Sequence, residues 1–340
     1  MNAGKINEKL EFGRLARREK LPRSAYSFLT ISRRGHRVGR SQKILSKNDC
    51  RPRVLGLVTK CRLSIASISA ASVLYCASAT AAPIDVETAF TYDNNVTRAQ
   101  RDSDILDDRF ASLQIGTSFL QWLNQNNRII YRGFIRGEFY DKYDKLSNGT
   151  LGASATYQYR ASGEFTAATY GAFVRASIAE FSSNLRDSDF LNVGISFRKP
   201  FTDRIVYTAQ LTYNKRDSDS TVFDTTDVSF LQNVDYAMGD RWTAYFTYNY
   251  LDGDATSTAT PWLKVIDVAE AINVDDAFGP GRFVYRFDAR THVLTLGTNF
   301  RINEQNSFDL SVRWVESQAT LDKDLKYERW IVSLAYLTRF

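Results

Sequence analysis

The chain has 340 residues, a net charge of +6 and a pI near 9.1, but its charge is unevenly distributed. Residues 1–82 hold 17 of the 44 Lys and Arg and 4 of the 38 Asp and Glu, so residues 83–340 hold 27 and 34 and carry a net charge of −7. This acidic body excludes the nucleic-acid partner that the overall pI suggests, and we expect no such partner.

A secretory signal peptide is predicted over residues 54–82. Lys60 and Arg62 precede the apolar run "LSIASISAASVLY" (63–75), and the small residues of "CASATAA" (76–82) follow it. A positive segment, a short apolar segment and small residues at the cleavage point are typical of such signals. We expect cleavage after Ala79 or Ala81.

Residues 1–53 stand in front of this signal, whereas a signal peptide begins near the N-terminus. The stretch "SRRGH" (32–36) is similar to a twin-arginine signal, but no apolar run follows it directly. A transit peptide is disfavoured by Glu8, Glu11 and Glu19. We therefore expect translation to begin near Val54, with residues 1–53 as a mis-annotated or disordered extension.

The body, residues 83–340, repeats one pattern, in which segments of about ten alternating residues are separated by turn-rich stretches. Residues 150–159, for example, place Leu151 and Ala153 on one face and Gly152 and Ser154 on the other. This period of two predicts twelve β-strands. They are expected near 84–92, 109–119, 129–140, 150–159, 164–178, 190–198, 204–215, 227–238, 241–251, 284–301, 307–316 and 330–340.

The connections between these strands alternate in length. Short turns such as "KPFTD" and "NEQN" follow the even-numbered strands, and mostly longer stretches rich in Asp and Ser follow the odd-numbered ones. An even number of ten-residue strands with short turns at one end and longer loops at the other predicts an all-β, antiparallel, up-and-down transmembrane barrel. A soluble β-sandwich also alternates, but it does not require this loop asymmetry together with a secretion signal.

The chain ends in "WIVSLAYLTRF" (330–340), where Trp330, Val332, Leu334, Tyr336 and Phe340 share one face and only a threonine interrupts them. This tail resembles the C-terminal strand signal of Gram-negative outer-membrane proteins. The stretch "AFTYDNNVTRA" (89–99) also resembles the first strand and loop of uncharacterised proteobacterial outer-membrane barrels. The resemblance implies a cell outer-membrane location, insertion by the barrel-insertion machinery that reads the tail, and contact with outer-membrane lipids and lipopolysaccharide. We expect a monomer.

Few residues of the body have catalytic or metal-binding chemistry. Residues 83–340 contain no cysteine and one histidine, His292, so we expect no metal and no cofactor. Twelve-stranded outer-membrane barrels include a phospholipase, whose catalytic histidine lies two residues before a nucleophilic serine. In this chain the residue two positions after His292 is Leu294 rather than a serine. His292 shares a face with Leu294 and Leu296, which indicates an interfacial histidine rather than an enzyme.

The opposite, inward-facing parity carries a set of charged residues. They are Arg132, Arg136, Glu138, Arg175, Arg198, Arg313, Arg329, Asp85 and Glu87. Two interpretations stay open. The charges either pair with one another and fill a narrow barrel, or they line a water-filled passage for small anions.

The longest loop, 252–283, contains "TPWLKVIDVAEAINV", which predicts a short amphipathic helix. We expect this loop to be the place of ligand contact or constriction.

The sequence as a whole favours a passive porin-like channel for small anionic or sugar-like solutes. The alternative is a non-conducting structural barrel or one that serves the export or assembly of an envelope polymer. A lipid-modifying enzyme is the weakest of the three hypotheses.

Overall fold

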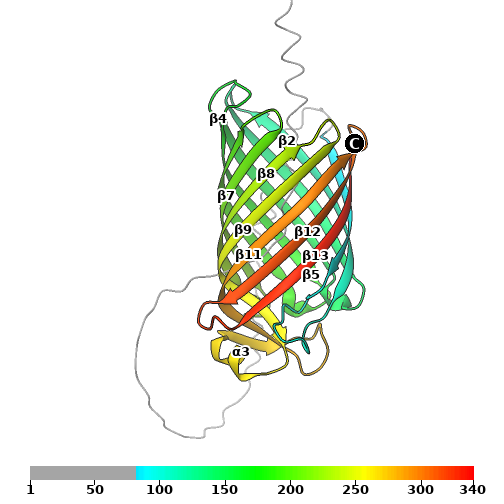
Figure 1. The fold of residues 1–340 in the computed structure, drawn as a ribbon, viewed down its shortest axis with the longest axis vertical. Helices are drawn as coiled ribbons and strands as arrows, with labels where there is room; N and C mark the ends of the chain where they lie inside the picture. The colour runs from blue at the N-terminus through cyan, green and yellow to red at the C-terminus, as the bar shows by residue number, and fades with distance from the viewer. Residues whose placement is uncertain (1–81) are drawn as a thin grey trace, which may run out of the picture. The chain divides into compact units, whose positions relative to one another are not determined.

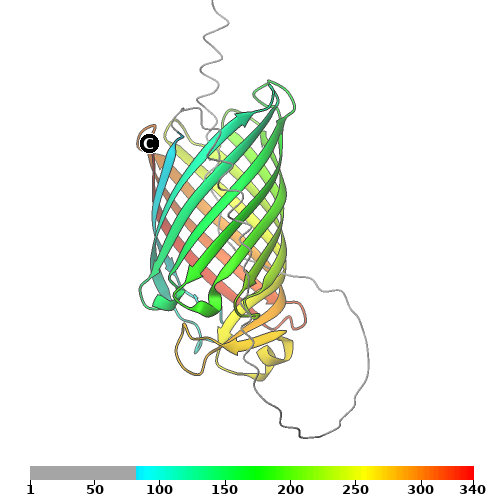
Figure 2. The same ribbon diagram turned by 180° about the vertical axis from the view of Figure 1, so that it is seen from behind.

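The computed structural model describes residues 82–340, so the predictions for residues 1–53 and for a signal peptide at 54–82 lie outside the described residues, Ala82 apart. Twelve long antiparallel strands form a closed barrel, which confirms the predicted architecture (Figures 1 and 2). The barrel strands are β1 (Ile84–Asp93), β2 (Asp108–Trp122), β3 (Asn127–Tyr140), β4 (Asn148–Arg160), β5 (Thr169–Phe181), β6 (Ser188–Pro200), β7 (Ile205–Ser218), β8 (Thr225–Ala237), β9 (Trp242–Ala259), β11 (Phe283–Arg301), β12 (Asn306–Ala319) and β13 (Lys326–Arg339).

The ring closes between the first and last strands. β1 pairs with β13 from Asp85 opposite Arg339 to Asp93 opposite Ile331. The other strands pair in sequence order, except that β9 pairs directly with β11. The short strand β10 (Ala271–Val274) pairs with residues 283–286 of β11, beyond the point where β12 ends. The strands β9, β11 and β10 therefore continue past the barrel as a small ribbon.

The two ends of the barrel differ, as the sequence predicts. At the turn end, the strands are joined by 123–126, 161–168, 201–204, 238–241 and 302–305, and the C-terminus lies there too (Figure 1). At the long-loop end they are joined by 94–107, 141–147, 182–187, 219–224, 260–282 and 320–325. Short 3-10 turns occur at this end in η2 (Asp144–Leu146) and η3 (Asn184–Arg186).

Several predicted boundaries are wrong at the long-loop end. The strands there run further than ten residues, to 18 in β9 and 19 in β11, so three loops that the Asp- and Ser-rich composition predicted to be long have six residues each. Polar residues such as Arg216 and Ser218 continue the alternation of inward and outward side chains and pair with residues of β6. The hydrogen-bonded strand therefore extends into a segment whose polar composition predicted a loop. Strand β5 begins at Thr169 rather than near 164, which leaves 161–168 as an eight-residue turn.

The two faces of the barrel wall carry different side chains. Large apolar residues such as Phe90, Ile135 and Leu296 are exposed on the outward face, at 69%, 63% and 63%. The inward face is mostly small and polar, with buried residues such as Thr247 and Ser317. Exposed apolar side chains on one face and polar ones on the other are the pattern of a barrel whose outside contacts lipid. No helix within residues 82–340 is long and apolar enough to cross a membrane.

Three inward-facing aromatic rings lie over glycines on the neighbouring strand. A Cβ atom placed on any of these glycines would overlap the ring beside it, and each ring and its glycine are direct register partners. The pairs are Tyr245 with Gly297, Phe134 with Gly152, and Phe173 with Gly194. The absent side chain of each glycine thus gives a large ring room to lie against the wall.

An apolar cluster lies on the inward face at the long-loop end. Leu251, Phe287 and Val315 of β9, β11 and β12 are buried together there. Val265 and Val268 of α3 (Leu263–Val268) belong to the same cluster, so the helix in the longest loop packs against one side of the barrel mouth.

Candidate functional site

The nine charged residues predicted to face inward all occupy inward positions of their strands, and each is half-buried. They divide into residues that are ion-paired and residues that are not. This division decides how much fixed charge the inner wall presents.

Two ion pairs join β1 to β13 across the closing seam. Arg339 donates to both carboxylate oxygens of Asp85, from Nε at 2.6 Å and from Nη2 at 3.0 Å. Arg329 likewise donates two hydrogen bonds to Asp93, with Nε to Oδ1 at 3.0 Å. Such bidentate pairs are the stronger kind of charge-assisted hydrogen bond. They lie at opposite ends of the seam, because Asp85 is near the turn end and Asp93 is near the long-loop end.

A third pair lies within β3. Arg136 Nη2 is 2.7 Å from Glu138 Oε1, and Asn148 of β4 donates to the other oxygen of the same carboxylate at 3.1 Å. Arg175 and Arg198 also have interaction partners. The packed, ion-paired interpretation therefore holds for part of the inner wall.

Arg132 and Arg313 differ from these residues. Within residues 82–340, neither has a hydrogen bond or an ion pair, and the same is true of Glu87. Arg313 is close enough to Arg136 and to Arg329 for their charges to repel. Asp93 is also near enough to attract Arg313, but it is bonded to Arg329. The wall thus retains two arginines, Arg132 and Arg313, that form no ion pair within residues 82–340.

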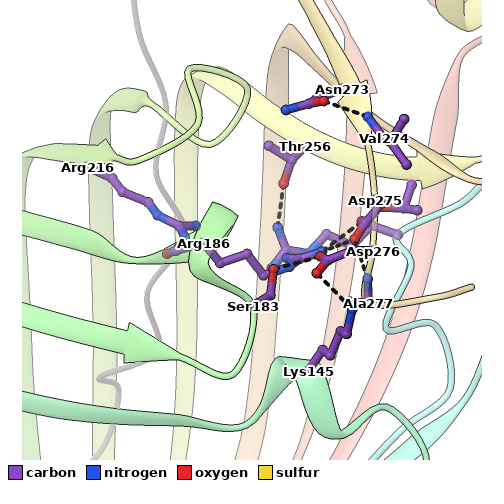
Figure 3. Close-up of polar contacts among 12 residues, drawn as sticks. Lys145, Ser183, Arg186, Arg216, Thr256, Asn273, Val274, Asp275, Asp276 and Ala277 are labelled. Carbon is purple, nitrogen blue, oxygen red and sulfur yellow. Dashed lines mark hydrogen bonds and ion pairs between the residues drawn. The ribbon is translucent and has the colours of Figure 1, made fainter. Parts of the chain in front are cut away.

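Three further arginines at the long-loop end, Arg98, Arg186 and Arg216, lie near Arg329, and we call these four the mouth cluster. Arg186 of η3 donates to both oxygens of Asp275, at 2.9 and 2.7 Å (Figure 3). Arg329 is paired with Asp93. Arg98 donates from Nη1 to Thr256 Oγ1 at 2.9 Å.

Arg216 is held by neutral groups. Its Nε donates to Ser188 Oγ at 2.7 Å and its Nη2 to the carbonyl of Arg186 at 2.9 Å. The guanidinium groups of Arg186 and Arg216 both lie over the Phe223 ring, at 4.4 and 5.4 Å from its centroid. Cation–π contacts of this kind stabilise arginines that are removed from bulk water.

The loop that presents Arg98 is built around Asn95. The Asn95 side chain donates to Ala99 O at 2.8 Å and accepts from Ala99 N at 3.0 Å. Arg98 has a φ of 57°, a left-handed conformation that a non-glycine residue adopts only when its surroundings fix it. Burial lowers the pKa of the Arg98 guanidinium, and the nearby charge of Arg329 lowers it further.

Residues 260–282, which we call the mouth loop, are tied to the far side of the barrel. Beyond its bond to Arg186, the Asp275 carboxylate accepts from Thr258 Oγ1 at 2.6 Å. Its neighbour Asp276 accepts from Ser183 at 2.7 Å and from Lys145 Nζ at 3.0 Å (Figure 3). The mouth loop, which begins after β9, is therefore fastened to the connections that follow β3 and β5.

The helix predicted in this loop is present but shorter than the pattern suggests. The helix α3 spans Leu263–Val268, and the residues after it form β10 instead. Its buried side chains are Val265 and Val268, whereas Leu263 and Ile266 are 77% and 40% exposed. The face of α3 that carries the two valines packs against the apolar cluster of the barrel wall.

Sequence reasoning missed Arg98, Arg186, Arg216, Asp93 and Asp275. Arg216 lies one residue beyond the predicted end of its strand at 215, and it has inward parity. Extending the predicted strand by one residue would have placed Arg216 among the inward-facing residues. The others lie in or beside loops, where a period of two carries no information. His292 lies on the outward face as predicted, with its Nδ1 2.9 Å from the Tyr248 hydroxyl.

No protein-family model and no curated protein matches the chain. Among solved structures, an outer membrane channel from Pseudomonas putida F1 is similar, with a TM-score of 0.52 and 9% identity over 77% of this chain and 97% of that one. The β domain of the Bordetella autotransporter BrkA matches with a TM-score of 0.42 at 9% identity, over 76% and 100% of the two chains. An anion-selective porin from Comamonas acidovorans matches with 0.35 at 10%, over 76% and 98%. The match to the P. putida channel shows that the chain has the fold of an outer-membrane β-barrel.

Proposed function

We propose that the protein is a passive channel of the Gram-negative outer membrane for small anionic solutes. The observation that carries this proposal is the pair of inward arginines, Arg132 and Arg313, that form no ion pair within residues 82–340. Fixed positive charge in a narrow, low-dielectric passage raises the local concentration of anions and lowers that of cations. Electrostatic neighbours connect Arg98 of the mouth cluster through Arg329 and Arg313 to Arg136, so this charge extends into the barrel.

The exposed apolar outward face and the fold of the P. putida channel support an outer-membrane location. We infer that the turn end faces the periplasm and the long-loop end faces outward, since outer-membrane barrels have short periplasmic turns. Outer-membrane lipids, lipopolysaccharide and the barrel-insertion machinery are then its partners, and a monomer is sufficient for a closed ring.

A non-conducting structural or export barrel is the alternative function. One observation favours it, namely that the mouth loop is tied across the long-loop end through Asp275 and Asp276. We propose no enzymatic role. The outward His292 is bonded to Tyr248, and the residue two positions after it is Leu294 rather than a nucleophile.

Single-channel recording in planar bilayers tests the proposal. The wild-type protein should conduct, and its reversal potential across a salt gradient should indicate a preference for anions. Replacing Arg132 and Arg313 together by Gln should shift the reversal potential towards cation preference, and high salt should reduce the difference by screening. Neither arginine is ion-paired, so the double variant should keep a folded, heat-modifiable barrel.

Arg109→Gln is the matched control, because Arg109 is exposed on the outward face of β2. It removes the same charge without touching the passage and should leave the selectivity unchanged. A wild-type barrel that is folded but silent in the bilayer would replace the channel by the structural function. A conducting barrel whose selectivity ignores Arg132 and Arg313 would refute their role.

A further inference from the structure

The mouth cluster holds more positive charge than its carboxylates neutralise. Arg186 is paired with Asp275, and Arg329 is paired with Asp93. Within residues 82–340, neither Arg98 nor Arg216 is hydrogen-bonded to a carboxylate, and their hydrogen bonds go to hydroxyl and carbonyl oxygens.

These four guanidinium groups are close enough to repel one another. Arg98 interacts electrostatically with Arg329 and Arg186, and Arg216 interacts with Arg186 and with Arg98. Like charges held together at a protein surface are costly unless an opposite charge joins them. The two existing ion pairs leave Arg98 and Arg216 without an ion pair within residues 82–340, and the carboxylates that attract them, Asp93 and Asp224, are not bonded to them.

The cluster also has unused hydrogen-bond donors. A guanidinium group has five N–H donors, and Arg98 uses one of them in the bond to Thr256. The Nε of Arg186 is buried and has no acceptor. Arg98 and Arg216 are half-buried, so each side chain keeps some exposed surface.

We propose that the mouth cluster is a binding site for one oxyanion, a phosphate or carboxylate group, with Arg98 and Arg216 as its main ligands. The forked guanidinium matches two oxygens of such a group better than it matches a spherical ion such as chloride. This inference rests on the proposed function, since it names the class of solute that would bind at the outer entrance of the channel. The left-handed Arg98, fixed by Asn95, aims a charged side chain into this site rather than towards solvent.

Isothermal titration of the detergent-solubilised full barrel tests the site. Sodium phosphate, sodium acetate and sodium chloride are titrated at constant ionic strength. We expect the wild type to bind phosphate or acetate at one site, at least tenfold more tightly than chloride. Binding of phosphate alone would identify a tetrahedral oxyanion, and binding of acetate as well would extend the class to carboxylates.

Two variants remove the ligands. Arg98→Asn eliminates the charge and keeps the left-handed conformation, which asparagine tolerates well, and Arg216→Gln removes the second guanidinium. Each should weaken oxyanion binding at least tenfold, while Arg109→Gln on the outward face should bind as the wild type does. Heat-modifiability shows that each variant is folded.

The proposal is overturned if the wild type binds neither oxyanion more tightly than chloride, or if folded Arg98→Asn and Arg216→Gln barrels bind as tightly as the wild type. Binding in detergent requires no conduction, so the two proposals can fail separately. Binding without bilayer current would reject the channel and keep the site, whereas current without binding would do the reverse.

Discussion

At the scale of single residues, Phe340 contributes little packing. Its side chain is 75% exposed on the outward face, while its backbone N–H donates to Ile84 O at 2.9 Å. A fully buried phenylalanine is worth roughly 3–5 kcal/mol, and this ring is not buried within the protein. Since the ring adds little to the stability of the protein, we propose that the terminal aromatic acts in recognition during insertion.

Phe340→Ala should accordingly separate insertion from stability. We expect much less heat-modifiable barrel in outer-membrane fractions of cells, but a urea unfolding midpoint of the refolded protein close to that of the wild type. Thr338→Ala, on the same face of β13, is the control and should be inserted normally. Wild-type membrane levels of Phe340→Ala would contradict the insertion signal.

Gly297 tests how the inner wall accommodates large rings. In Gly297→Ala, the added methyl group would overlap the Tyr245 ring, which now donates to Asp309 at 2.8 Å. We expect the ring to swing away from the wall, with a loss of about 1–3 kcal/mol from overpacking and a lower single-channel conductance.

Two variants make this test specific. Gly133→Ala on the outward face meets nothing within 4 Å and should change neither quantity. Adding Tyr245→Ala to Gly297→Ala should restore the conductance, since it removes the displaced ring. An unchanged conductance in Gly297→Ala would show that Tyr245 can be displaced without narrowing the passage.

At the scale of elements, the mouth loop depends on a buried ion pair. Asp275 is 1% exposed and accepts from Arg186 and Thr258. Removing one partner of a buried pair costs roughly 3–5 kcal/mol, because the other charge is left without a counter-charge. Asp275→Asn should therefore release the loop while the strands stay paired.

Limited trypsin digestion of proteoliposomes measures this release at Lys264 and Arg282, the basic residues of the mouth loop. Cleavage there should be at least tenfold faster in Asp275→Asn than in the wild type. Asp267→Asn changes an exposed carboxylate in α3 and should digest at the wild-type rate. Equal rates in all three proteins would mean that the loop is held by its apolar contacts alone.

Asp276 makes the same loop sensitive to acid. Burial raises the pKa of its carboxyl group, but hydrogen bonds from Ser183 and Lys145, together with the positive charges of Lys145 and Arg186, leave the pKa below its ordinary value. Because the folded pKa is depressed, the stabilisation is complete above the unfolded pKa of about 3.9 and is lost as the pH falls through the folded pKa.

A spin label on Asp267→Cys, in a body without other cysteines, reports this transition. Its mobility should be constant down to about pH 4 and should rise below it. Asp276→Asn should remove the acid step and show higher mobility throughout. A step that persists in Asp276→Asn would assign the acid sensitivity to another group.

The elements were predictable to different degrees. The strands in the barrel wall follow from alternation, because one face meets an apolar environment and the other does not. The ends of β9 and β11 and the strand β10 were not predictable, since their residues, such as Asp252 and Thr256, are polar and pair for reasons of topology. The inward positions of Arg132 and Arg313 could be predicted from the alternation along their strands. Their lack of ion-pair partners could not be predicted, because it depends on which strands become neighbours.

At the scale of the whole molecule, orientation in the membrane is testable on intact cells. The mouth loop should be labelled from outside and the turn at 302–305 should not, since the long-loop end is proposed to face outward. Single cysteines at Asp267 and Glu304, both exposed, are suitable probes for a membrane-impermeant maleimide. Permeabilised cells serve as the control, in which both positions should react. The reverse pattern in intact cells would invert the proposed topology.

The two bidentate pairs on the seam between β1 and β13 also bear on how the ring is assembled. Their partners are 254 and 236 residues apart in the chain, so they meet only when the sheet curls and its two edges join. Before that moment, each edge of the open sheet exposes carboxylates on β1 or arginines on β13. Unlike charges on the two edges favour their joining to each other, and like charges on equivalent edges of two molecules disfavour joining between copies. The charges on the seam thus specify which edges join, β1 with β13, and disfavour contacts between two β1 edges or two β13 edges of half-formed barrels.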